Sequence, residues 1–317
     1  MGLEETENME SAGADMDRGI LIEEDSPRDG IQNEAAPFSI EERVGLIDAL
    51  SLCGFRQIQA GSFVHPGKVP QMAQTEKVFE RIRRRPGVVY SALVLNRQGL
   101  QRAVECGVEH LSVFVSASEE HSRKNANCSV AEAARAAREV IEAATGRNIF
   151  VRAGIMNAFG CRFEGSIPFD RVLGLARSFA EWGADEINLA DTAGLGNPRQ
   201  VEELVSQARD SIGLPLSLHL HDTFGFGLAN VFAAFRKGVT RFDASCGGLG
   251  GCPFIPGAAG NVPTEDVVHL LESIGAPTGI DPGRLLDVVR GLEEKLGRKL
   301  NGRYGGALKK CALQAVR

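Results

Sequence analysis

The stretch Leu216-Ser217-Leu218-His219-Leu220-His221-Asp222-Thr223-Phe224-Gly225 places two histidines near the end of an apolar, β-prone run that a glycine follows. This pattern predicts a strand that ends in a turn. Side chains alternate in direction along a strand, so His219 and His221 point to the same face. Two adjacent imidazoles suit a divalent metal better than a core. A pair of structural histidines is the alternative, but the chain has only 6 histidines, and two share this face. We therefore favour metal ligands.

Strand-like and helix-like patterns alternate along the rest of the chain. Apolar, β-prone runs predict strands at residues 19–24, 56–63, 88–95, 110–116, 149–156, 186–190, 214–220 and 241–245. A helical pattern follows each run, and capping boxes open two of these helices, at Ser39-Ile40-Glu41-Glu42 and Ser129-Val130-Ala131-Glu132. We expect a polar loop at residues 25–37 and one helix at residues 71–84.

These units predict the fold class. Eight strand–helix units, roughly thirty residues apart, indicate a closed (β/α)8 TIM barrel. Asp281-Pro282 begins one further, C-terminal helix. The alternative fold is an open doubly wound sheet, which typically has a glycine-rich phosphate-binding turn after its first strand. The chain instead has Ser26-Pro27-Arg28-Asp29-Gly30 there, so we favour the barrel.

Composition limits the domain organisation and the partners. The 317 residues are 43% hydrophobic and 24% charged, as in soluble globular proteins, and no apolar run is long enough to cross a membrane. The net charge of −6 argues against a nucleic-acid partner. Seven cysteines without the spacing of a small disulfide scaffold indicate a reducing compartment, and the absence of a C-x-x-C pair argues against a zinc ribbon or a thioredoxin-type site. We expect an acidic disordered tail at residues 1–18, a barrel at 19–300, a tail at 301–317, and a cytoplasmic location.

Polar residues gather at the predicted C-terminal ends of the strands, where barrel enzymes have their active sites. Candidates for contact with a substrate are Gln32, Gln59, Ser62, Asn157, Asn188 and Asp191. Asp29 would be a third metal ligand, and the amide oxygen of Asn261 a fourth. Two imidazoles with carboxylate and amide oxygens suit Mg²⁺ or Mn²⁺. For Asp29 the alternative is an aspartate that caps a helix or stabilises a turn. For Asn261 the alternative is a helix-entry cap, which is the better interpretation of that residue taken alone.

Two further residues have the chemistry of a reaction site. The guanidinium of Arg28 can hold a developing oxyanion, although a surface ion pair is the alternative. Cys252 lies in the glycine-rich run at residues 247–257, which we interpret as a mobile lid. A buried, inert thiol is the alternative for Cys252.

Several motifs together resemble a known family. They are Ser26-Pro-Arg-Asp-Gly-Ile-Gln-Asn-Glu34, His219-Leu-His-Asp-Thr-Phe-Gly225, Gly248-Leu-Gly-Gly-Cys-Pro-Phe254, and the segments 62–64, 69–72, 124–125 and 127–129. From about Gly19 to Leu296 the chain resembles 3-hydroxy-3-methylglutaryl-CoA lyase, one of the metal-dependent barrel lyases related to isopropylmalate synthase and 4-hydroxy-2-oxovalerate aldolase. The glycine-rich loop with its Cys-Pro is the motif most specific to the CoA lyases.

The resemblance implies residue roles and a reaction. It implies that Asp29, His219, His221 and Asn261 bind the metal, that Arg28 holds the thioester or enolate oxygen, and that Cys252 takes part in proton transfer. Asp191 and Glu265 fall on family site positions, and Lys124 and Asn125 lie where the family holds the acyl-CoA arm. The implied reaction is retro-Claisen cleavage to acetyl-CoA and a 3-oxo acid, as in leucine degradation and ketone-body formation. Either His219 or Asp29 could be the base. We also expect a homodimer.

The chain departs from the family pattern in the pocket wall. It has Gln59 where the family has Glu; Gly154, Met156 and Asn157 where Tyr, Ser and Cys are expected; and Asn188 in place of Ser. The loss of a tyrosine at Gly154 predicts extra space and a larger substituent at C3 of the substrate. The rival functions are a related aldolase or Claisen-condensing enzyme acting on another acyl or 2-oxo acid substrate, and a non-catalytic acyl-CoA-binding homologue.

Overall fold

The computed structural model describes residues 19–250 and 260–306. The N-terminal tail predicted at residues 1–18, the candidate Cys252, and residues 307–317 of the predicted C-terminal tail lie outside the described residues.

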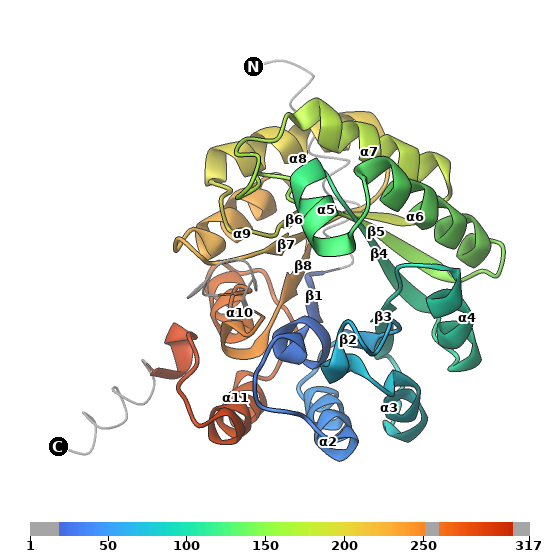
Figure 1. Cartoon of the computed structure of the whole chain (residues 1–317). Helices are drawn as coiled ribbons and strands as arrows, with labels where there is room; N and C mark the ends of the chain where they lie inside the picture. Colours follow the sequence, from blue (N-terminus) through green and yellow to red (C-terminus); the bar gives the residue numbers. More distant parts are fainter. Residues whose placement is uncertain (1–18, 251–259, 307–317) are drawn as a thin grey trace.

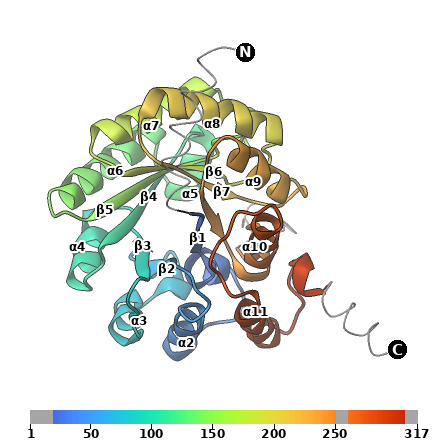
Figure 2. The same cartoon turned by 180° about the vertical axis from the view of Figure 1, so that it is seen from behind.

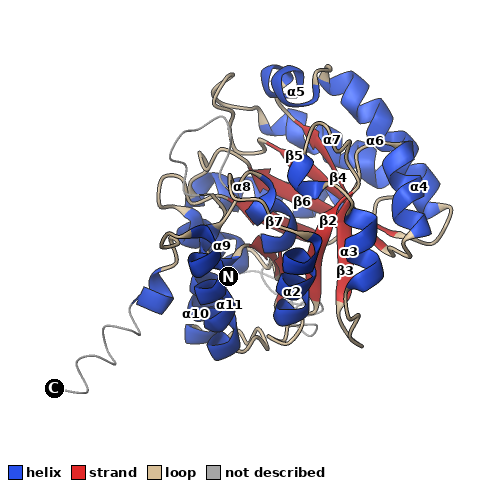
Figure 3. Cartoon of the chain, turned by 60° about the horizontal axis from the view of Figure 1, so that its bottom comes forward, coloured by secondary structure: helices blue, strands red, loops and turns tan. Residues whose placement is uncertain are grey.

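The strands form a closed parallel barrel in which each strand pairs with the next and β8 pairs with β1 (Figures 1 and 2). The strands are β1 Leu21–Glu24, β2 Gln57–Ser62, β3 Val89–Leu93, β4 His110–Ser116, β5 Phe150–Met156, β6 Glu186–Asp191, β7 Leu216–Leu220 and β8 Arg241–Ala244. Helices surround these strands (Figure 3). The predicted (β/α)8 TIM barrel is therefore confirmed.

The helices are α2 Ile40–Leu50, α3 Thr75–Arg81, α4 Arg97–Glu105, α5 Glu119–Ala126, α6 Val130–Thr145, α7 Phe169–Glu181, α8 Pro198–Ile212, α9 Gly227–Arg236, α10 Thr264–Ser273 and α11 Pro282–Leu296. Both predicted capping boxes are present, at Ser39 before α2 and at Ser129 before α6. The extra C-terminal helix is α11, which packs against α2 and α10.

Two local predictions were wrong, and one helix was not predicted. Residues 26–30 of the expected loop form a helical turn, η1 Ser26–Gly30. The helix expected at residues 71–84 is divided, because Gln74 has a left-handed backbone (φ 58°) that separates the short turn η2 Pro70–Met72 from α3. Helix α5 was missed because its sequence is almost wholly polar and carries no apolar period.

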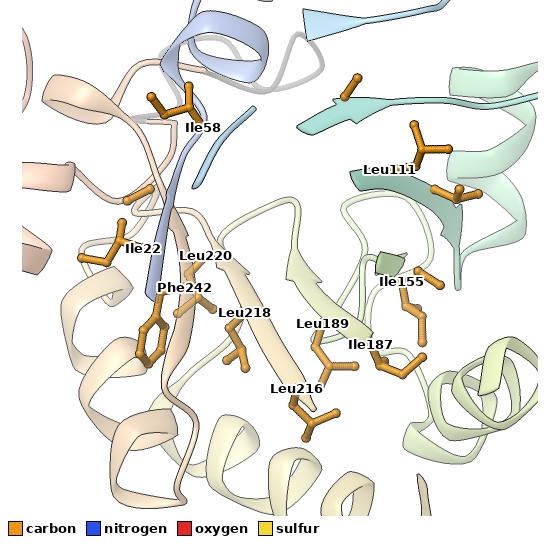
Figure 4. Packing of buried hydrophobic residues seen from close by; sticks show 14 of the residues in the cluster. Ile22, Ile58, Leu111, Ile155, Ile187, Leu189, Leu216, Leu218, Leu220 and Phe242 are labelled. Carbon is orange, nitrogen blue, oxygen red and sulfur yellow. The ribbon is translucent and has the colours of Figure 1, made fainter. Parts of the chain in front are cut away.

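Alternating side chains give the barrel an apolar exterior, packed on the helices, and a polar interior. Ile58, Ile155 and Leu218 belong to the buried apolar cluster (Figure 4). Their strand neighbours Arg152 and His219 belong to the opposite, polar face.

The first residues of the predicted C-terminal tail are attached to the barrel. The backbone N–H groups of Arg303 and Tyr304 donate to the carboxylate of Asp266 on α10. The N–H of Asn301 donates to the carbonyl of Gly247, in the turn η3 Cys246–Gly248 that follows β8. None of the helices in the described ranges has both the length and the apolar character that a transmembrane segment needs.

Candidate metal centre and active site

Three predicted ligands converge at the C-terminal end of the barrel. Asp29 comes from η1, directly after β1, while His219 lies in β7 and His221 follows it. One donor atom from each of the three lies within 4.8 Å of the others. The Nε2 atoms of His219 and His221 are 3.1 Å apart, and two adjacent ligands of an octahedral cation at about 2.1 Å lie about 3 Å apart. The geometry therefore fits a divalent cation.

Asn261 provides a fourth donor. Its Nδ2 donates to Asp29 Oδ2 (2.8 Å) and to the carbonyl of Leu249 (2.9 Å). Its Oδ1 is buried and has no hydrogen-bond partner among the described residues, which costs free energy unless a ligand satisfies it. The side chain does not cap α10, since the residue before that helix is Pro263. These contacts support the metal-ligand interpretation over the helix-cap alternative.

Gly250 allows Asn261 and Asp29 to pack closely. Its φ is 99°, and a Cβ at this position would lie 2.4 Å from Asn261 Nδ2 and 2.8 Å from Asp29 Oδ2. Contacts this short do not occur for a real Cβ, so a side chain at residue 250 would displace both candidate ligands.

Burial and neighbouring charges set the protonation of the three candidate ligands. Burial lowers the pKa of His221 to about 3, helped by the charge of His219, so this imidazole is neutral near pH 7. Burial raises the pKa of Asp29, but the charges of Arg28 and the two histidines outweigh burial, and the pKa falls to about 2. Burial likewise lowers the pKa of His219, but the contact with the Asp243 carboxylate and the nearby Asp25 and Asp29 carboxylates outweigh it and raise the pKa to about 10.

Arg28 lies beside the candidate ligands and is buried, so its guanidinium is not part of a surface ion pair. Its guanidinium pairs with Asp29, donates from Nε to Gln59 Oε1, and lies with Nη2 3.3 Å from Asp25 Oδ2. A guanidinium has five N–H donors and these contacts use three, so donors remain for a substrate oxygen.

Three of the predicted substrate-binding residues are fully buried and contact other protein groups. Gln59 bridges Arg28 and Ser112, whose Oγ accepts from Gln59 Nε2 at 3.2 Å. Asn188 donates to Ser217 (2.9 Å) and to Asp243 (3.2 Å). Their side chains have 0% exposure. In this arrangement they hold neighbouring groups in place.

Asp191 belongs to the same group. Its two oxygens accept from the backbone N–H groups of Leu195 and Gly196, each at 2.9 Å, and it too has 0% exposure. Burial raises its pKa to about 6.

The other predicted residues are spread around the barrel mouth. Asn157 has a left-handed backbone (φ 59°) and donates to Ser116, while Ser62 is buried and Gln32 half-buried. Lys124 and Asn125 are exposed on α5, where Lys124 Nζ lies 3.8 Å from the centre of the Phe163 ring. Glu265 is buried and accepts from the N–H of Gly247 (2.9 Å), and burial raises its pKa to about 7.

The space predicted at Gly154 is filled. Phe114 of β4 lies opposite Gly154 of β5 in the register, and a Cβ at residue 154 would lie 2.1 Å from Phe114 Cε1. The phenyl ring therefore occupies the room that the missing side chain leaves. The ring is half-buried, on the same strand face as Ser112 and Ser116.

The barrel encloses a buried polar network that was not predicted from the sequence. Arg152 Nη1 pairs with Asp243 Oδ1 (2.5 Å) and also with Glu23, and its Nη2 donates to Ser112 (3.1 Å). Asp243 Oδ2 lies 3.2 Å from His219 Nδ1. The available signal was polar residues at alternating positions of predicted strands, the pattern that a polar lumen requires.

The chain matches the HMGL-like family model over residues 20–291. It is 42% identical over 292 residues to the hydroxymethylglutaryl-CoA lyase of Pseudomonas mevalonii, covering 92% of this chain and 97% of that protein. It is 39% identical over 290 residues to the 3-hydroxy-3-isohexenylglutaryl-CoA/hydroxy-methylglutaryl-CoA lyase of Pseudomonas aeruginosa, covering 91% and 97%. Among solved structures, an HMG-CoA lyase from Acinetobacter baumannii in complex with coenzyme A and 3-methylmalate has a TM-score of 0.87 and 40% identity, covering 91% of this chain and 94% of that one.

Proposed function

Because the chain belongs to the HMGL-like family, we propose that it is a divalent-metal-dependent lyase that cleaves 3-hydroxy-3-methylglutaryl-CoA to acetyl-CoA and acetoacetate. One observation carries the proposal: Asp29, His219 and His221 meet within 4.8 Å, beside Arg28 and the amide oxygen of Asn261, which has no partner in the described part of the chain. The names of the relatives from the two Pseudomonas species support the same reaction.

The four donors would hold Mg²⁺ or Mn²⁺, whose Lewis acidity favours loss of the proton from the tertiary 3-hydroxyl of the substrate. The C2–C3 bond then breaks: its electron pair goes to C2, and C3–O becomes the carbonyl of acetoacetate. The remaining donors of Arg28 are placed to hydrogen-bond the thioester oxygen as it becomes an enolate oxygen. A proton added at C2 completes acetyl-CoA.

Two proton transfers are needed. Asp29 is the candidate acceptor of the hydroxyl proton, since it lies at the candidate metal centre, whereas both ring nitrogens of His219 are engaged, Nδ1 with Asp243 and Nε2 toward the cation site. For the proton that returns to C2 the candidate is Cys252, and this assignment rests on the family resemblance.

The pocket wall supports a small C3 substituent. The Phe114 ring covers Gly154, so the missing side chain gives no room for a longer group. The name of the Pseudomonas aeruginosa relative includes both an isohexenyl and a methyl substrate. For this chain we propose the methyl substrate, with Phe114 as the residue that limits the size of the C3 group.

We also propose that the substrate is bound as an acyl-CoA thioester. The coenzyme A in the Acinetobacter structure supports an acyl-CoA substrate, with Lys124 and Asn125 as candidates for contact with its arm. The loaded metal, the homodimer, the cytoplasmic location and the pathway stay predictions.

A single assay tests the function. The full chain, freed of metal with EDTA and reloaded with Mg²⁺ or Mn²⁺, is incubated with 3-hydroxy-3-methylglutaryl-CoA and with homologues carrying longer C3 groups, and the products are identified by mass. We expect acetyl-CoA and acetoacetate in equal amounts only when metal is present. His221→Gln should abolish turnover. His110→Gln is the matched control, because His110 is a half-buried histidine stacked on Phe150, outside the metal group.

The rival functions predict other results. Product formation from pyruvate and an aldehyde, without thioester cleavage, would indicate an aldolase. Coenzyme A binding without turnover of any thioester would indicate a non-catalytic homologue.

A further inference from the structure

The metal-facing orientation of His219 depends on what its other ring nitrogen contacts. Nε2 of His219 faces Nε2 of His221 at 3.1 Å. On the opposite side of the ring, Nδ1 lies 3.2 Å from Oδ2 of Asp243, in β8. Asp243 is buried and belongs to a neighbouring strand, with His219 and Asp243 paired in the register.

The Asp243 carboxylate is itself held from two sides. Arg152 Nη1 lies 2.5 Å from Oδ1, and Asn188 Nδ2 donates to Oδ2 at 3.2 Å. A carboxylate paired with a buried guanidinium has no proton to give, so the hydrogen in the contact with His219 belongs to Nδ1. The lone pair of Nε2 is then the one that can face a metal.

Asp25 is the other carboxylate close to His219 Nδ1, but it lies too far away to accept a hydrogen bond from it. Asp25 Oδ2 lies 3.6 Å from His219 Nδ1, beyond hydrogen-bond length. The same oxygen lies 3.3 Å from Arg28 Nη2. Asp243 therefore has the better contact with the ring.

The network also reaches Arg28. Arg152 donates to Ser112 at 3.1 Å, Ser112 accepts from Gln59 at 3.2 Å, and Gln59 accepts from Arg28. One continuous set of buried contacts thus supports a candidate metal ligand at one end and the candidate oxyanion donor at the other.

The geometry points to Asp243 as a positioning residue: it fixes the tautomer and ring direction of His219, so that Nε2 is presented to the divalent cation. This inference deepens the proposed function and rests on it. Metal-bound histidines commonly donate their second N–H to a carboxylate, and loss of that partner weakens metal affinity about 10- to 100-fold.

The test compares two isosteric variants of the full chain. Asp243→Asn removes the carboxylate beneath His219. Glu23→Gln is the matched control, because Glu23 is equally buried and pairs with the same Arg152, while His219 contacts Asp243 and Asp25 instead. Each metal-free protein is titrated with Mn²⁺ at one pH by calorimetry, and thermal unfolding is followed alongside.

We expect Asp243→Asn to raise the Mn²⁺ Kd about 10- to 100-fold, and saturating Mn²⁺ to restore part of kcat. Glu23→Gln should keep the Kd within about threefold of wild type even if its Tm falls. Equal metal affinity in the two variants overturns the inference, whether both are weakened or neither is.

A second measurement covers the case in which Asp243→Asn does not fold. In wild-type protein labelled with ¹⁵N-histidine and saturated with Mg²⁺, the signals lost in His219→Gln identify His219. We expect hydrogen on Nδ1, and hydrogen on Nε2 would overturn the inference. Wild-type protein that binds no metal would instead defeat the proposed function, so the two failures are distinguishable.

Discussion

Gly250→Ala is a single-methyl change that should weaken cation binding at the candidate metal centre. The new Cβ would lie 2.4 Å from Asn261 Nδ2 and 2.8 Å from Asp29 Oδ2. Ordinary contact begins at 3.4 Å, so the Asn261 amide must move by about 1 Å, whereas ligand distances in a metal site tolerate about 0.2 Å. The positive φ of 99° adds backbone strain at this position. At least one oxygen ligand is therefore moved out of reach of the cation.

We expect the Mn²⁺ Kd of Gly250→Ala to rise at least about tenfold, or ~1.4 kcal/mol, with a matching fall in kcat/KM at subsaturating metal. Calorimetric titration of the metal-free protein measures the Kd. Gly247→Ala is the matched control: φ is 62°, and a Cβ would lie 2.4 Å from Leu300, outside the metal group. It should lower the Tm but leave the Kd unchanged. Wild-type metal affinity in Gly250→Ala would refute the assignment of Asn261 and Asp29 as ligands.

Three further changes probe the pocket, the oxyanion donor and the buried histidine of α5. Phe114→Ala should raise kcat/KM for a thioester with two extra C3 methylenes about tenfold relative to kcat/KM for the methyl substrate, since two buried methylenes contribute about 1.6 kcal/mol. If the ratio of the two kcat/KM values does not change, the Phe114 ring does not limit the size of the C3 group. Gln59→Ala removes a hydrogen-bond acceptor of Arg28, and a hydrogen bond to a charged group contributes about 1.5–3 kcal/mol. We therefore expect kcat/KM to fall about 10- to 100-fold while the Mn²⁺ Kd stays unchanged. A parallel loss of Mn²⁺ affinity would contradict the idea that Gln59 acts by positioning Arg28. Burial lowers the pKa of His121 from 6.5 to about 4, so its contribution to stability is complete above pH 6.5 and is lost as pH falls towards 4, about 3 kcal/mol in all. Urea unfolding measured between pH 6.5 and 4 should show that the free energy of unfolding of His121→Gln falls less steeply with pH than that of the wild type. An equally steep fall in both proteins would contradict the lowered pKa of His121.

The fold followed from local sequence signals. Strand–helix alternation and the capping boxes at Ser39 and Ser129 require only neighbouring residues, and they predicted the barrel. The spacing of His219 and His221 predicted a shared direction for the same reason. Helix α5 has no apolar face to detect, and it was missed.

The rest of the site depends on contacts that exist only once the barrel closes. Asp243 meets His219 and Arg152 because β5, β7 and β8 enclose one lumen, and no spacing along the chain encodes that meeting. Gln59 was predicted to contact substrate because it ends a strand, yet its amide is used by protein groups. Phe114 fills the space over Gly154 because the two residues are opposite each other in the pairing of β4 with β5, and this register was not predicted from the sequence.

The most direct test of the proposed metal centre is a crystal structure of the full chain with Mn²⁺, with the ion located by anomalous scattering. We expect one strong peak bound by Asp29, His219, His221 and the amide oxygen of Asn261, each at about 2.1–2.3 Å. A peak between Asp25, His219 and Asp243, the other group of possible ligands in the described residues, or no peak at the barrel mouth, would contradict this expectation.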